Sequence, residues 1–82
     1  MKITQIVLRK QFVEGPLKAI FSVTFDDEFV LHDVKLVESK EKKLIVMPNR
    51  KDGEGKYVDI AHPINSKFRN QLEEQIINFY ST

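Results

Sequence analysis

Basic side chains in the second half of this sequence are the residues best suited to recognition chemistry. They are Arg50, Lys51, Lys56, Lys67 and Arg69. Lysine and arginine neutralise phosphate groups and release counterions, so such a set gives affinity for nucleic acid with strong salt dependence and little sequence information. Arg50 and Lys51 lie in a segment with two glycines, which can move to meet a phosphate backbone. The pattern predicts five nucleic-acid contacts, with ordinary solubilising charges as the alternative.

Two of these bases, Lys67 and Arg69, fall in the first turn of an expected helix. Free N–H groups at a helix start also favour phosphate, so the two effects would add. No helix-turn-helix partner precedes this helix, so base readout of that kind in the major groove is not expected.

Two histidines and the aspartates near them could form a metal site or an acid–base pair. His32 precedes Asp33, and His62 follows Asp59 by three positions. This spacing matches no standard metal motif. Strict alternation puts His32 on the strand face of Val34, which predicts a packed, hydrogen-bonded histidine, and His62 is expected to position a turn before the helix. No metal ligand is predicted.

The acidic run at residues 26–28 could supply paired carboxylates for hydrolysis. Between two apolar strands, however, such residues are typical of a turn. The sequence has no phosphate-cradling glycine motif and no serine elbow. We therefore predict no catalytic residue, no cofactor and no small-molecule substrate, and hence no enzyme.

Aromatic side chains have two possible uses, core packing and stacking on nucleic-acid bases. The alternation of Phe21, Phe25 and Phe29 favours burial in a core. Tyr57, beside the basic segment, is the better candidate for stacking.

The elements that must position these residues are read from the periodicity of apolar side chains. Strands are expected at residues 3–12, 19–25, 29–37, 44–47 and 57–61, with turns at 14–16, 26–28 and 38–43 and a loop at 49–56. After Pro63 the period becomes helical, with Asn65 or Ser66 as the helix cap. The predicted fold is a single α+β domain over residues 1–82: an antiparallel sheet of about five strands followed by one C-terminal helix.

Composition sets the remaining limits. The chain has 82 residues, no cysteine and a formal net charge of +1. It contains no apolar run of the roughly 20 residues that span a membrane and no signal peptide, so a cytoplasmic protein without a membrane partner is expected. Charge is uneven: residues 14–33 sum to −4 and residues 35–69 to +4.

Several predicted strands carry apolar residues on both faces. One helix of about 15 residues is roughly 22 Å long and covers two or three strands of one face. The uncovered apolar surface predicts a homodimer. A sharply bent sheet that wraps its own core is the alternative.

Three segments resemble the SpoVG family of small bacterial regulators, named for stage V of sporulation and for septation. They are residues 19–33 (AIFSVTFDDEFVLHD), 47–48 (MP) and 59–66 (DIAHPINS). The resemblance runs in order along nearly the whole chain. It implies a homodimer with an antiparallel sheet and a C-terminal helix that binds DNA, and in some members RNA.

The resemblance also implies which bases make the contacts. The basic pair of the family falls on Arg50 and Lys51, and its arginine near the helix start falls on Arg69. Val58 stands where a base is expected and Gly53 where a proline is expected. Lys56 is the nearest replacement for the missing base.

The sequence is interpreted as a homodimeric nucleic-acid-binding regulator of gene expression and of septation or sporulation, in the bacterial cytoplasm and associated with the nucleoid. Its mechanism would be occupancy, in which phosphate contacts from two protomers hold the dimer on nucleic acid. The alternative is a protein-interaction module that acts on the division or transcription machinery without contacting nucleic acid.

Overall fold

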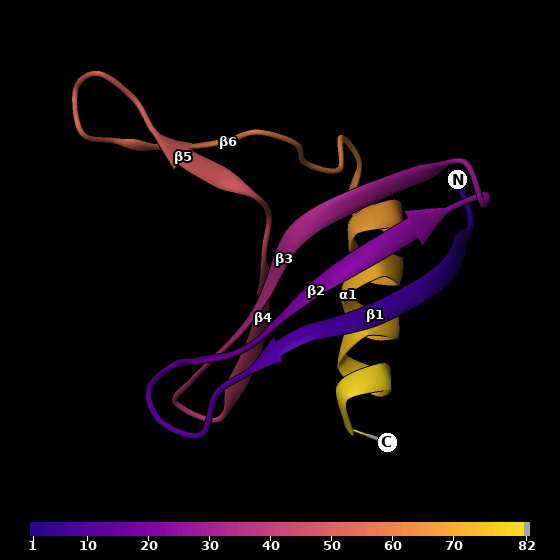
Figure 1. Ribbon diagram of the computed structural model, residues 1–82, viewed down its shortest axis with the longest axis horizontal. Helices are drawn as coiled ribbons and strands as arrows, with labels where there is room; N and C mark the ends of the chain where they lie inside the picture. Colours follow the sequence, from indigo (N-terminus) through magenta and orange to yellow (C-terminus); the bar gives the residue numbers. More distant parts are fainter. Residues whose placement is uncertain (82) are drawn as a thin grey trace.

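A computed structural model describes residues 1–81. Four strands form one antiparallel sheet in the order β1-β2-β3-β4, two short strands form a separate antiparallel ribbon, and one helix ends the chain (Figure 1). Their bounds are β1 Ile3–Gln11, β2 Leu17–Phe25, β3 Phe29–Ser39, β4 Lys42–Val46, β5 Asn49–Lys51, β6 Tyr57–Asp59 and α1 Ser66–Ser81. The predicted α+β class, with an antiparallel sheet and a C-terminal helix, is confirmed.

The separate ribbon of β5 and β6 was not predicted. Residues 49–51, assigned to a loop, form β5, and the predicted fifth strand, β6, pairs with β5 rather than with the main sheet. Pro48 explains the separation: proline has no N–H to continue the ladder of β4, so the chain leaves the sheet there.

Two of the three connections in the main sheet are tight turns. Asp26 and Asp27 have φ of 53° and 54°, and Glu28 N donates to Phe25 O at 3.0 Å. The acidic run is therefore a hairpin turn, as predicted. Positive φ at both central positions gives the turn a backbone twist that matches the right-handed twist of the two flanking strands. The second turn is shorter than the predicted 38–43 segment, since β3 and β4 extend to enclose only two residues, Lys40 and Glu41, also at positive φ.

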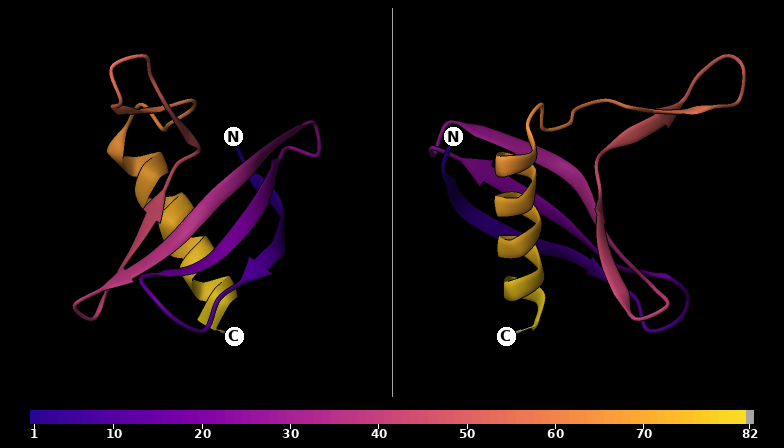
Figure 2. Two further views of the ribbon diagram at one scale, coloured as in Figure 1. Left: turned by 60° about the vertical axis from the view of Figure 1, so that its left-hand side comes forward. Right: turned by 180° about the vertical axis from the view of Figure 1, so that it is seen from behind.

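The helix covers one face of the sheet and leaves the other bare (Figure 2). Leu72 and Ile76 of α1 are buried against β2 residues that alternate as predicted. Those β2 residues are Ala19, Phe21, Val23 and Phe25, all at most 2% exposed. Among residues 1–81 no helix combines the length and apolar character needed to cross a membrane.

Strand β3 contains a β-bulge that changes which side chains share a face. Phe21 pairs with Val34 and Val23 pairs with Leu31, so two steps along β2 match three along β3. The extra residue lies at Asp33, which has φ of 62°. A bulge shifts the alternation by one residue. As a result Leu31 and Val34, on either side of it, both face the helix.

The structure corrects two expectations from strict alternation, the first of them through the bulge. His32 does not share a face with Val34: it lies on the bare face, is exposed, and forms a hydrogen bond between its Nδ1 and Ser22 Oγ at 2.8 Å. The hydrogen bond was predicted, but the packing was wrong. Phe29 is also not a core residue, because it lies at the hairpin end and is 57% exposed.

The bare face, here called the outer face, carries apolar and polar side chains in about equal number. Its polar members include Ser22, which is buried, and Lys10 and Lys35, which flank Ile20 in the register. Register and alternation assign to it seven apolar side chains: Val7, Leu17, Ile20, Val30, Val37, Leu44 and Val46. No element within residues 1–81 covers them.

Candidate nucleic-acid interface

Residues 49–59 form a hairpin that extends away from both sheet and helix, and we call it the arm (Figures 1 and 2). Its base is closed by a hydrogen bond from Ile60 N to Pro48 O at 2.7 Å. Its tip is ordered by Asp52, whose Oδ1 accepts from the backbone N–H of Glu54 and Lys56 at 2.8 and 2.9 Å. Gly55 has φ of 84° and completes this turn. The segment predicted as a mobile glycine loop therefore has defined hydrogen bonding.

The pairing of the arm sets the direction of its bases. Lys51 pairs with Tyr57, and Arg50 pairs with Val58. Adjacent residues on a strand point to opposite sides, so Arg50 and Lys51 lie on opposite faces of the arm. Lys51 Nζ lies 5.7 Å from the ring centroid of Tyr57, within range of a cation–π interaction. Lys56, also exposed, adjoins Tyr57 at the tip.

Charge on the arm is balanced overall but not paired. Three bases and three acids (Asp52, Glu54 and Asp59) give residues 49–59 a formal sum of zero. Within the described chain, none of Arg50, Lys51 or Lys56 forms an ion pair with a carboxylate. The ammonium and guanidinium groups are thus available at short range, while attraction over long distances is weak.

The helix start is the second basic site. Asn65 caps α1, since its Oδ1 accepts from Phe68 N at 2.7 Å. Lys67 and Arg69 are exposed in the first turn, which contains no acidic residue. Arg69 Nε lies 3.8 Å from Glu73 Oε2, one turn further along, so its charge is partly offset. Lys67 has no such partner among residues 1–81.

Between the arm and the helix lies a segment, residues 60–65, that separates the two groups of bases. The arm leads away from the helix start (Figure 2). Lys67 and Arg69 therefore do not join Arg50, Lys51 and Lys56 in one compact patch on a single protomer. Sequence reasoning could not find this separation, because it depends on the direction in which the arm leaves the sheet.

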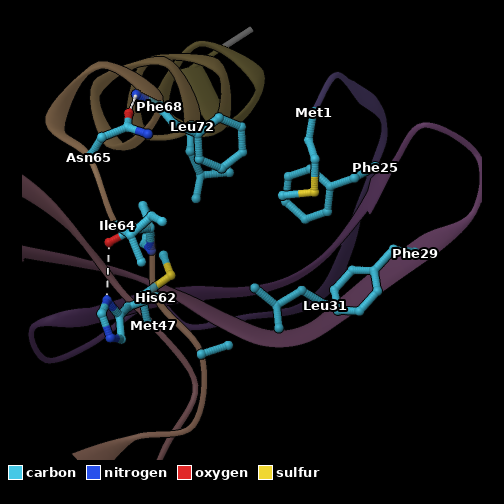
Figure 3. Close-up of a pocket in the computed structure, with 12 residues that line it drawn as sticks. Met1, Phe25, Phe29, Leu31, Met47, His62, Ile64, Asn65, Phe68 and Leu72 are labelled. Carbon is cyan, nitrogen blue, oxygen red and sulfur yellow. Dashed lines mark hydrogen bonds between the residues drawn. The ribbon is translucent and has the colours of Figure 1, made fainter.

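An apolar groove of about 310 Å³ lies beside the helix start and was not predicted (Figure 3). Phe68 and Leu72 of α1 lie on one side, and Phe25, Phe29 and Leu31 of the β2–β3 hairpin lie on the other. The sequence had assigned Phe25 and Phe29 to a core, and no sequence signal showed that the helix would leave a gap here.

Comparison with known proteins identifies the family. The sequence profile of SpoVG matches residues 1–82. The chain belongs to the SpoVG family. It is 51% identical over 81 residues to a relative from Alkaliphilus metalliredigens, covering 99% of this chain and 83% of that protein. A relative from Caldanaerobacter subterraneus is 52% identical over 80 residues (98% and 88% covered), and one from Agathobacter rectalis 49% over 82 (100% and 94%). Each carries the name SpoVG with septation as its ascribed role.

The histidines of this SpoVG chain take local roles. His62 Nδ1 lies 3.0 Å from Pro63 O, within the turn that leads to α1 (Figure 3). His32 is held by Ser22 on the outer face. Across residues 1–81 no three residues of the types His, Cys, Asp or Glu lie together so as to hold a metal ion. Ser22 was not singled out from the sequence, and only the tertiary pairing reveals its contact.

Proposed function

We propose that this SpoVG-family protein binds nucleic acid as a homodimer and regulates gene expression and septation by occupying it. DNA is the first candidate ligand and RNA the second, in the bacterial cytoplasm and at the nucleoid, with septation or sporulation as the process affected. The observation that carries the proposal is the arm, which presents three bases without ion-pair partners well outside the packed core. Phosphate contacts of this kind position a protein without reading sequence.

The outer face is the proposed dimer interface. The four strands have 9, 9, 11 and 5 residues. At about 3.3 Å per residue and about 4.8 Å between strands, they give a flat footprint of roughly 540 Å². Side-chain relief raises this toward the roughly 800 Å² per partner of a standard stable interface. The seven apolar side chains of the outer face would supply apolar contact area, and its polar side chains would supply the polar share that such interfaces also contain. A two-fold axis through this face would carry two arms and two helix starts into one assembly.

Salt dependence tests phosphate binding. If about four phosphates are neutralised per dimer, the logarithm of the binding constant for duplex DNA falls with the logarithm of salt concentration with a slope near −3.6. Fluorescence anisotropy from low to moderate salt measures this slope. A flat response would rule out the mechanism.

A double substitution locates the contacts. Arg50→Ala with Lys51→Ala should weaken binding to unrelated sequences to a similar extent and leave the melting temperature nearly unchanged, because both side chains are exposed. The matched control is Lys40→Ala with Lys42→Ala, two exposed lysines at the β3–β4 turn. Equal losses from both pairs would mean that only net charge matters and would contradict an interface on the arm.

The dimer has its own test. Leu44, 44% exposed on the outer face, would be buried against the partner. Burial of a leucine contributes about 1.5–3 kcal/mol. Leu44→Glu should therefore weaken association of the two protomers by about tenfold or more. Light scattering should give twice 9.6 kDa for the wild type and a mass near 9.6 kDa for the variant when dilute. Val13→Glu, at a residue 94% exposed in a turn, is the control. A monomeric wild type would refute the dimer.

The apolar groove favours a second candidate function, a protein-interaction module acting on the division or transcription machinery. Ile64 beside it is 90% exposed and Phe29 57% exposed, which is costly for a surface without a partner. A pull-down with the wild-type protein separates the two functions. Capture of division or transcription proteins that survives nuclease treatment would favour this candidate, and nuclease-sensitive capture favours nucleic-acid binding.

A further inference from the structure

One face of the arm pairs a positive charge with an aromatic ring in a way that the proposed phosphate binding does not require. Lys51 and Tyr57 are direct cross-strand partners, so their side chains stand next to each other on the same face. The 5.7 Å between Lys51 Nζ and the ring centroid confirms that they meet. Arg50 and Val58 occupy the other face.

The ring of Tyr57 is open to solvent. It is 72% exposed, and β6, which carries it, pairs only with β5 among the described strands. The ring therefore contributes little to a core. It is nevertheless held on a defined backbone, because the base of the arm is closed by Ile60 and the tip is ordered by Asp52. An exposed, oriented aromatic beside a base is a suitable platform for a flat ligand that carries negative charge.

A nucleotide has both properties, a flat base and a phosphate. Stacking on an aromatic ring tolerates any base, since every base has a π-face, and a neighbouring lysine can attract the phosphate. In a duplex the faces of the bases are already stacked on each other, so a protein ring reaches one only after the base is unstacked. A single exposed tyrosine therefore matches an unpaired base.

We propose that this face of the arm, formed by Lys51 and Tyr57, is a binding site for single-stranded nucleic acid. Tyr57 stacks on an unpaired base, and Lys51 moves from the ring toward the adjacent phosphate. The inference rests on the proposed nucleic-acid binding and adds the class of ligand. It also gives the two faces of the arm different tasks, because Arg50 opposite has no aromatic partner on the described chain.

The experiment compares two probes at one fixed salt concentration. A labelled oligothymidylate of about 15 nucleotides, in the size range of small single-strand sites, and a duplex of equal length are titrated with protein in fluorescence anisotropy. The wild type should bind the single strand more tightly. Tyr57→Leu should bind it about fivefold to 150-fold more weakly, the loss that removal of one base–aromatic stack produces, while duplex binding stays within about twofold.

Three further variants control the result. Tyr57→Phe keeps the ring and should bind the single strand as the wild type does, and Val58→Ala, on the other face of the arm, should change little. The chain has only two tyrosines and no tryptophan, so Tyr80→Phe leaves Tyr57 as the only tyrosine. Its emission should be quenched by the single strand and not by the duplex.

The outcomes separate this inference from the function on which it rests. If the wild type binds neither probe, the proposed nucleic-acid binding itself is wrong. If the wild type binds the single strand and Tyr57→Leu binds it equally well, stacking is wrong while nucleic-acid binding stands. Equal weakening toward both probes, or a change from dimer to monomer in light scattering of Tyr57→Leu, would make Tyr57 a structural residue and overturn the inference.

Discussion

Deletion of Asp33 should leave the faces of β3 unchanged, although it removes a residue from the middle of the strand. The residue is the extra one in the β3 bulge. Without it, His32 alone lies opposite Ser22, so the residue pairs on either side of the bulge keep their register. Leu31 and Val34 therefore still face the helix.

A slip of the register toward the hairpin would instead be costly. Leu31 is partly buried against the core, and full burial of a leucine contributes about 1.5–3 kcal/mol, so a slip would lose about 1–2 kcal/mol there. The rings of Phe25 and Phe29, 6.3 Å apart, would account for about 0.5–1.5 kcal/mol more. A loss of about 2–3 kcal/mol would be large beside the roughly 4–12 kcal/mol total expected for a chain of this length.

Urea denaturation followed by circular dichroism distinguishes the two outcomes. With a slope of about 1 kcal/mol per molar urea, a slipped register would lower the midpoint by roughly 2–3 M, whereas the regular ladder should keep it within about 1 M of the wild-type midpoint. Asp33→Gly is the matched control: it keeps the bulge and relieves positive φ, so its midpoint should stay near that of the wild type. A deletion variant whose midpoint falls by about 2 M or more, while Asp33→Gly is unaffected, would refute this reasoning, because the flanking register would then depend on the bulge.

Three further perturbations test other parts of the structure. Asn65→Ala should lower the free energy of unfolding by about 1 kcal/mol in the same urea assay, because the hydrogen bond from Phe68 N to the cap is lost. Asn65→Asp should keep this hydrogen bond and the stability, and equal losses from both variants would contradict the cap. Arg50→Ala and Lys51→Ala, made singly, should change the salt slope for a single strand unequally, with the larger reduction, about 0.7 per lost phosphate contact, for Lys51→Ala. Phe21→Ala should lower the free energy of unfolding by about 3–5 kcal/mol, measured by thermal denaturation. This buried ring packs edge to face on Phe79 and Tyr80, with ring centroids 6.1 and 6.4 Å away. A loss below about 1 kcal/mol would refute this core packing.

The elements of the main sheet and the helix were largely predictable because each rests on local periodicity. Alternation in β2 identified its four buried apolar residues, and the helical stripe after Pro63 identified α1. Sequence also identified the exposure of the five bases, since charged side chains rarely lose water without a partner. It did not identify β5, a strand of three mostly polar residues that exists only because β6 pairs with it.

The same distinction applies to the candidate site. The sequence by itself determined the family, the α+β class and the set of basic residues, and it limited the helix cap to Asn65 or Ser66, because these depend on residue type and short-range spacing. Only the tertiary structure decided which faces those residues occupy. The bulge at Asp33 reverses the alternation of β3, and the departure of the chain at Pro48 sends the arm away from the helix. Both are consequences of hydrogen-bond register between strands distant in sequence, which no local pattern of side chains encodes.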